Sequence, residues 1–69
     1  MLGDRSAVVR EASSFDLHGV TYHDVVLTFE DGSGVSARLG PEAVPEKLQA
    51  GDRVVVTMAA GLVLSIRAA

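Results

Sequence analysis

A chain of 69 residues has room for one small domain and excludes a catalytic domain joined to a regulatory one. It contains no cysteine, so neither disulfides nor thiolate-bound zinc can stabilise it. Its formal net charge of −3 disfavours nucleic-acid binding by bulk charge, because the field of the whole molecule repels polyanions. We therefore expect one domain over residues 1–69, held together by core packing or self-association.

Eleven valines against seven leucines and one isoleucine favour β-strands, because β-branched side chains pack well on a pleated sheet. The longest uncharged stretch, residues 54–66, is shorter than the roughly 20 apolar residues that a membrane-spanning helix needs. The first five residues include an acid and a base and lack the pattern of a secretory signal. We predict an all-β protein with no membrane partner and a cytoplasmic location.

The first strand is predicted over residues 6–12, although its alternation is imperfect. Ala7 and Val9 share one face and Val8 lies on the other, so a β-bulge is expected to bring both valines to the core. Residues 13–19 either extend this strand or form an ordered loop, because Phe15 and Leu17 are in phase with each other.

Residues 22–30 predict a second strand with clear period-two alternation. Its core face consists of Val25, Leu27 and Phe29. Asp31 and Gly32 follow directly, and an Asp-Gly pair between two alternating runs is typical of a β-hairpin. The return strand covers residues 35–39, with Val35, Ala37 and Leu39 facing inward.

Residues 40–51 are not expected to form a strand inside the sheet, because they contain two prolines. We expect a short helix over residues 45–49, with Pro45 in its first turn and Gly51 at the left-handed position that ends it. Val44 and Leu48 are four residues apart and are expected to close one end of a barrel.

Two more strands are predicted over residues 52–58 and 62–67. Their inward residues by alternation are Val54, Val56 and Met58 in the first strand and Leu62, Leu64 and Ile66 in the second. Val55 and Val63 therefore face outward. The order is three strands, a short helix and two strands.

This order resembles the OB-fold, a partly open five-stranded barrel. Residues 25–35 resemble the hairpin between the second and third strands of anticodon-binding OB domains, and residues 48–56 resemble their entry into the fourth strand. SH3-like small barrels use similar pieces and are the alternative. The predicted fold is an all-β, five-stranded small barrel with a short helix between the third and fourth strands.

The OB resemblance implies a ligand face on the outer side of the second and third strands, bordered by two loops. The residues at these positions are Tyr22, Val26, Thr28, Ser36 and Arg38, with Phe15, His18 and Ala60 in the loops. Related single-strand binders stack bases on several aromatic rings beside a basic groove. This chain has few aromatic residues, and Asp24 and Glu30 share the face. Binding of single-stranded nucleic acid is therefore the alternative function.

No motif in the chain predicts catalysis or a cofactor. Asp16, His18 and His23 suggest a three-ligand zinc site, but they lack any familiar ligand spacing, so we predict no metal. The serines lie outside any nucleophile elbow or oxyanion-binding turn, so we predict no catalytic residue and no enzyme activity.

Apolar residues exceed what the predicted core needs. The outward valines on neighbouring strands are Val26, Val55 and Val63. Arg38, Arg53 and Arg67 also face outward, where they either pair with acids of this chain or contact a phosphate or an acidic partner. Because exposed apolar patches often mark interfaces, we expect a binding or assembly module that acts through protein–protein contacts, including self-association.

Overall fold

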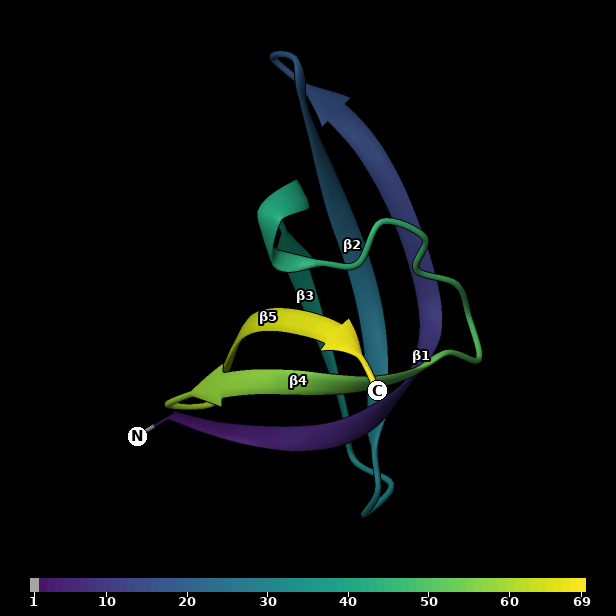
Figure 1. The fold of residues 1–69 in the computed structure, drawn as a ribbon, viewed down its shortest axis with the longest axis vertical. Helices are drawn as coiled ribbons and strands as arrows, with labels where there is room; N and C mark the ends of the chain where they lie inside the picture. The colour runs from purple at the N-terminus through teal and green to yellow at the C-terminus, as the bar shows by residue number, and fades with distance from the viewer. Residues whose placement is uncertain (1) are drawn as a thin grey trace.

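The computed structural model describes residues 2–69 as a single five-stranded antiparallel sheet (Figure 1). Its elements are β1 (Leu2–Leu17), β2 (Val20–Phe29), β3 (Gly34–Leu39), the 3-10 turn η1 (Pro41–Ala43), β4 (Arg53–Ala59) and β5 (Leu62–Ala68). The strands lie side by side in the order β3-β2-β1-β4-β5. The all-β prediction is confirmed, and residues 13–17 extend the first strand rather than forming a loop.

β1 joins the two halves of the sheet because its ends pair with different strands. Residues 2–8 run antiparallel to β4, and residues 7–17 run antiparallel to β2. A register shift leaves Arg10 without a partner on β2, which is a β-bulge that bends the strand. The sheet folds over at this bend, so that its edge strands β3 and β5 approach each other (Figure 1). No ladder joins them in the described part of the chain, and the sheet stays open.

One hydrophobic core fills the folded sheet. Its buried residues are Ala7, Val9, Val25, Leu27, Phe29, Leu39, Val54, Val56 and Ile66. The partly buried residues packed against them include Val35, Ala37, Val44, Leu48, Met58 and Val63. The predicted core face of β2 is confirmed. The expectation that both valines of β1 reach the core is wrong for Val8, which is 38% exposed, because the bulge comes after it.

The predicted hairpin between β2 and β3 is confirmed. Gly32 adopts a φ of +88°, which a residue with a Cβ rarely adopts. The Asp31 carboxylate accepts a hydrogen bond from the Ser33 backbone N–H at 2.9 Å. The Phe29 N–H donates to the Ser33 carbonyl at 2.8 Å, and these bonds together set the register of β2 against β3.

The predicted helix over residues 45–49 is wrong. The segment contains only the 3-10 turn Pro41–Ala43 and further turns. Its end is tied to β1, because the Gly51 N–H donates to the Val9 carbonyl at 2.8 Å and the Val9 N–H donates to the Asp52 carbonyl at 2.9 Å. A helix of five residues is too short to be stable on its own. The backbone groups at the end of the segment bond to β1 instead. The left-handed conformation expected at Gly51 is present, with φ at +94°.

The predicted phase of β5 is wrong in its first half. Val63 pairs with Met58 and packs against the core, whereas Ser65 pairs with Thr57. Leu64 is the extra residue between these pairs, so a β-bulge reverses the alternation there. As a result Leu62 is 66% exposed and Leu64 is 44% exposed, while Ile66 is buried as expected.

Candidate functional site

The outer face of β1, β2 and β3 gathers most of the predicted ligand-face residues. Since the core takes every second residue of β2, the residues between them face outward. Strand register places on this face Phe15 of β1, Tyr22, Val26 and Thr28 of β2, and Ser36 and Arg38 of β3. His18 lies in the β1–β2 turn, and Ala60 lies in the β4–β5 turn, each with positive φ as a tight hairpin turn requires.

Arg38 is the central cation of this face, and it is already paired. Its guanidinium donates to the two carboxylate oxygens of Asp24 at 2.8 and 3.3 Å. These hydrogen bonds lower the pKa of Asp24 below its ordinary value. The same guanidinium lies 4.8 Å from the centroid of the Phe15 ring. Phe15 in turn stacks on Tyr22, with ring centroids 5.8 Å apart. The Arg38 guanidinium therefore has its contacts within this chain, with the Asp24 carboxylate and the Phe15 ring, and Phe15 and Tyr22 contact each other.

A shallow depression of about 430 Å³ lies beside this cluster. Its polar lining comes from Glu11, Ser13, Asp24, Ser36 and Arg38. Two of these side chains are acids, and the one cation is neutralised by Asp24. The depression consequently lacks a free positive charge for a phosphate group.

The far half of the β1–β2 hairpin projects from the sheet (top of Figure 1). The ladder between β2 and β3 ends at His23, and the ladder between β1 and β4 ends at Val8. Residues 15–22 thus form a two-stranded ribbon whose strands pair only with each other. Such a ribbon is marginally stable in water without further packing.

One side of this ribbon is apolar. Phe15 pairs with Tyr22, and Leu17 pairs with Val20, so the four side chains share a face that we call the hairpin apolar face. Leu17 is 50% exposed and Val20 is 40% exposed. Val20 was not predicted on this face, because the alternation in the sequence placed the start of the strand at Tyr22, although the phase of Leu17 with Phe15 already indicated the face.

The valines predicted to form an interface do not make one patch. Val26 and Val55 are half-buried on the outer faces of β2 and β4, with β1 between these strands. The expected outward orientation of Val63 is wrong, since the bulge in β5 turns it towards the core.

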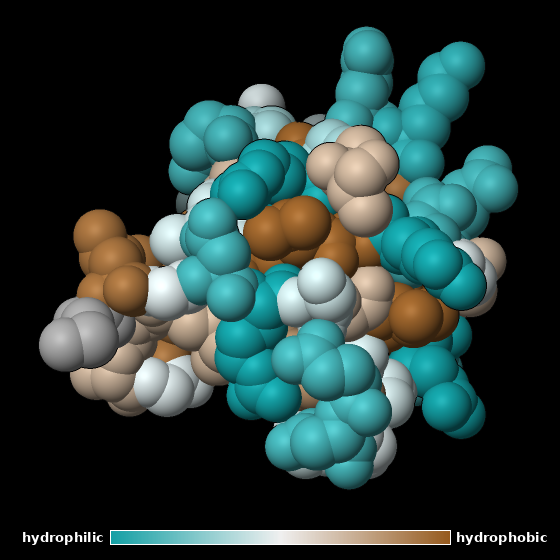
Figure 2. All heavy atoms as spheres, turned by 60° about the horizontal axis from the view of Figure 1, so that its bottom comes forward, coloured by the Kyte–Doolittle hydropathy of each residue, from teal (hydrophilic) through white to brown (hydrophobic). Residues whose placement is uncertain are grey.

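Other apolar residues are exposed instead at the N-terminal end of β1. Strand register aligns Leu2 with Ala59 and Ala59 with Leu62 across three strands. Leu2 is 68% exposed and Leu62 is 66% exposed. Figure 2 shows hydrophobic atoms gathered at its left edge, where this end of the molecule lies. The exposed apolar surface is therefore divided among the hairpin, the N-terminal end of β1 with the adjoining β5, and Val8 in the middle of β1.

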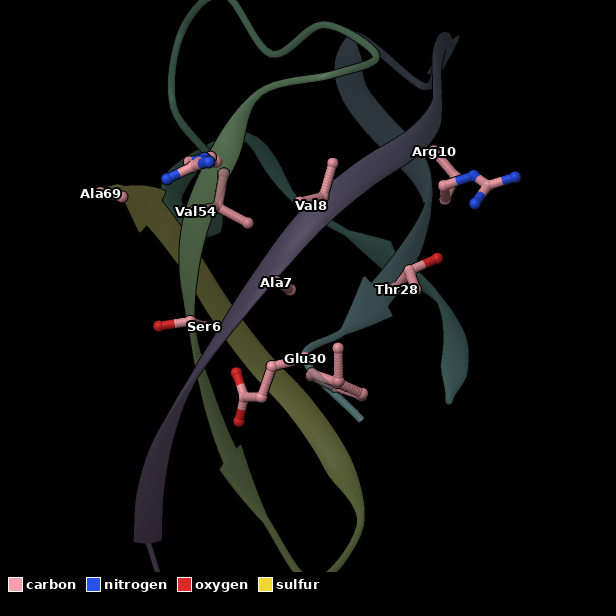
Figure 3. Close-up of a pocket in the computed structure, with 10 residues that line it drawn as sticks. Ser6, Ala7, Val8, Arg10, Thr28, Glu30, Val54 and Ala69 are labelled. Carbon is pink, nitrogen blue, oxygen red and sulfur yellow. The ribbon is translucent and has the colours of Figure 1, made fainter. Parts of the chain in front are cut away.

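A depression of about 550 Å³ lies where β1 crosses between β2 and β4 (Figure 3). Its apolar lining comes from Ala7, Val8, Phe29, Val54 and Ala69, and its polar lining comes from Ser6, Arg10, Thr28, Glu30 and Arg53. We call it the crossing depression. The ion pairs among residues 2–69 use Arg5, Arg38 and Arg67. Arg10 and Arg53 take part in none of them.

Neither a metal centre nor a matching relative points to a chemistry for this chain. Within residues 2–69 no group of three potential metal ligands is close enough to hold an ion, so Asp16, His18 and His23 do not form a site. No helix of the described residues has the length and hydropathy needed to span a membrane. Comparison with known proteins finds no matching family model, no similar curated protein and no similar solved structure.

Proposed function

We propose that this chain is a non-enzymatic binding module that acts through protein–protein contacts, including self-association. The observation that carries the proposal is the hairpin apolar face on a ribbon that projects beyond the rest of the sheet. Apolar side chains that a protein leaves exposed on a protruding element mark interaction surfaces. Covering Leu17 and Val20 with a partner would remove apolar area from water and support the ribbon at the same time.

The open sheet is also proposed to be a variant of the OB-type small barrel. Two features support this assignment: β1 is shared between β2 and β4, and β5 returns towards β3. Both features belong to a five-stranded, partly open barrel. The assignment implies binding without catalysis only by analogy, so the hairpin carries the functional argument.

Self-association is tested by measuring the average mass over a hundredfold concentration range, by light scattering or sedimentation. The wild-type mass is expected to rise with concentration. A variant with Leu17→Thr and Val20→Thr places β-branched threonines, which suit a strand, at both positions but replaces the two exposed apolar side chains with polar ones, so it is expected to stay monomeric. Leu62→Thr is the matched control, because it removes a leucine elsewhere that is even more exposed than Leu17.

Two outcomes would contradict the proposal. The first is a wild-type protein that remains monomeric throughout the range. The second is association that Leu62→Thr abolishes and the hairpin variant leaves intact, because the contact would then lie at the N-terminal end of β1.

A further inference from the structure

The turn between β2 and β3 contains the one aspartate of the chain that is followed by glycine. Asp31 precedes Gly32, whereas the aspartates at positions 4, 16, 24 and 52 precede arginine, leucine or valine, and the chain has no asparagine. The backbone nitrogen of the following residue can attack an aspartate carboxyl carbon, and glycine obstructs this attack least because it has no side chain. The sequence therefore contains a single position well suited to this reaction.

The surroundings of the turn leave room for the reaction. The Asp31 side chain is 61% exposed, so water reaches its carboxyl group. A Cβ added at Gly32 would meet no atom of residues 2–69 within 4 Å. The rest of the fold therefore does not obstruct a change in the backbone at this position.

Hydrogen bonds hold both reacting groups in the folded turn. The Gly32 N–H donates to the Phe29 carbonyl at 3.0 Å, so the attacking nitrogen is engaged in the turn. One oxygen of the Asp31 carboxylate accepts hydrogen bonds from the Ser33 hydroxyl and, at 2.9 Å, from the Ser33 N–H. The Arg5 guanidinium lies 3.5 Å from the other oxygen. The bonds from Ser33 are the main cause that lowers the pKa of Asp31, and they favour the ionised carboxylate, which a nitrogen attacks least readily.

We propose that Asp31 is a site of spontaneous isoaspartate formation, and that Ser33 slows the reaction by holding the carboxylate. In the first step the Gly32 nitrogen loses its proton and bonds to Cγ of Asp31. One carboxyl oxygen leaves as water with that proton and the carboxyl proton, which closes a five-membered succinimide ring. In the second step water adds to a ring carbonyl and opens the ring. Addition at the main-chain carbonyl carbon leaves the backbone linked through Cγ, and this product is isoaspartate.

The product is expected to disturb the outer face that the turn organises. Isoaspartate adds one carbon atom to the backbone path at Asp31. The turn closes through the bond from the Phe29 N–H to the Ser33 carbonyl at 2.8 Å, and the register that follows aligns Asp24 with Arg38. The reaction is independent of the proposed self-association, because it takes place at the β2–β3 turn and not at the hairpin apolar face.

The test incubates the folded protein in warm, mildly acidic buffer and locates isoaspartate by peptide mapping with tandem mass spectrometry. Isoaspartate is expected at Asp31 and not at the other four aspartates. Ser33→Ala removes the hydroxyl and is expected to form isoaspartate several-fold faster than wild type. Asp31→Glu is the negative control, because its longer side chain would have to close a less favourable six-membered ring.

Incubation in urea separates the effect of the fold from the effect of the sequence. Wild type and Ser33→Ala are expected to react at the same rate once unfolded, because the hydrogen bonds to Asp31 are then lost. The folded samples are compared only where their circular dichroism matches.

Three outcomes would contradict the proposal. Folded wild type and folded Ser33→Ala that both lack isoaspartate at Asp31 would overturn the site. Equal rates in the two folded proteins would overturn the role of Ser33. A faster rate for Ser33→Ala that persists in urea would also overturn that role, because the effect would then belong to the sequence and not to the folded turn.

Discussion

Phe29 links the hairpin turn to the core. It is 5% exposed, it pairs with Ala7 where β1 crosses, and its backbone closes the turn to β3. The Arg5 guanidinium lies 3.9 Å from the centroid of its ring and reaches Asp31 at 3.5 Å. An arginine side chain thereby covers the ring where the core meets solvent.

Replacing Phe29 with alanine is expected to unfold the protein. Such a change in a packed core costs about 3–5 kcal/mol, which is comparable with the whole stability of a domain this small. Circular dichroism and urea titration measure the effect. Tyr22→Ala, on the outer face of the same strand, is expected to stay folded. The opposite result would mean that the phase of β2 is reversed.

Acid is expected to weaken the fold through its paired carboxylates. Hydrogen bonds from Arg38 lower the pKa of Asp24, and those from Arg67 and Thr57 lower the pKa of Asp4. A carboxyl group whose pKa is lowered in the folded state stabilises the fold. This stabilisation is complete above the ordinary carboxyl pKa, at about pH 4, and it is lost as the pH falls through the folded-state pKa.

The urea midpoint should therefore drop as pH falls below about 4, and it should drop less steeply in Asp24→Asn. The difference is expected to be small, because exposed ion pairs contribute little. A profile identical in the variant and the wild type would show that the Asp24–Arg38 pair does not contribute to this pH dependence.

At the scale of the elements, the projecting ribbon should open independently of the rest of the sheet. Residues 15–22 are held by their own ladder, the stack of Phe15 on Tyr22 and the bond from Thr21 to Asp16, and Arg38 of β3 contacts the ribbon at the Phe15 ring. Segments with few outside contacts open locally at low free-energy cost.

Phe15→Ala is expected to speed amide hydrogen exchange in residues 15–22 by removing the stack on Tyr22 and the contact with Arg38. The amides of Leu27 and Val56, in the core, should keep their wild-type protection. The urea midpoint should change little in the same variant. A loss of protection throughout the sheet would show that the ribbon and the core unfold as one unit.

At the scale of the whole molecule, charge argues against binding of nucleic acid. The net charge is −3, and the central cation of the outer face, Arg38, is held by Asp24. Labelled single-stranded oligonucleotides titrated at low salt are expected to show no specific complex. A complex that weakens by about 1–3 kcal/mol with Tyr22→Ala would instead indicate base stacking on this face.

The sequence by itself determined those parts of the fold that depend on local alternation and turn chemistry. The inward phase of Val25, Leu27 and Phe29 and the Asp31-Gly32 hairpin both follow from neighbouring residues. The grouping of Phe15, Tyr22 and Arg38 also followed from strand phase, combined with the OB resemblance.

Only the tertiary structure decided where that alternation breaks and which surfaces stay uncovered. The bulge at Leu64 turns Val63 inward because register depends on pairing with β4, and the backbone of Gly51 bonds to β1 instead of ending a helix. The exposure of Leu17 and Val20 likewise depends on β3 and β4 stopping short of the hairpin tip. Pairing between segments distant in the chain sets these features, and a local pattern does not record it.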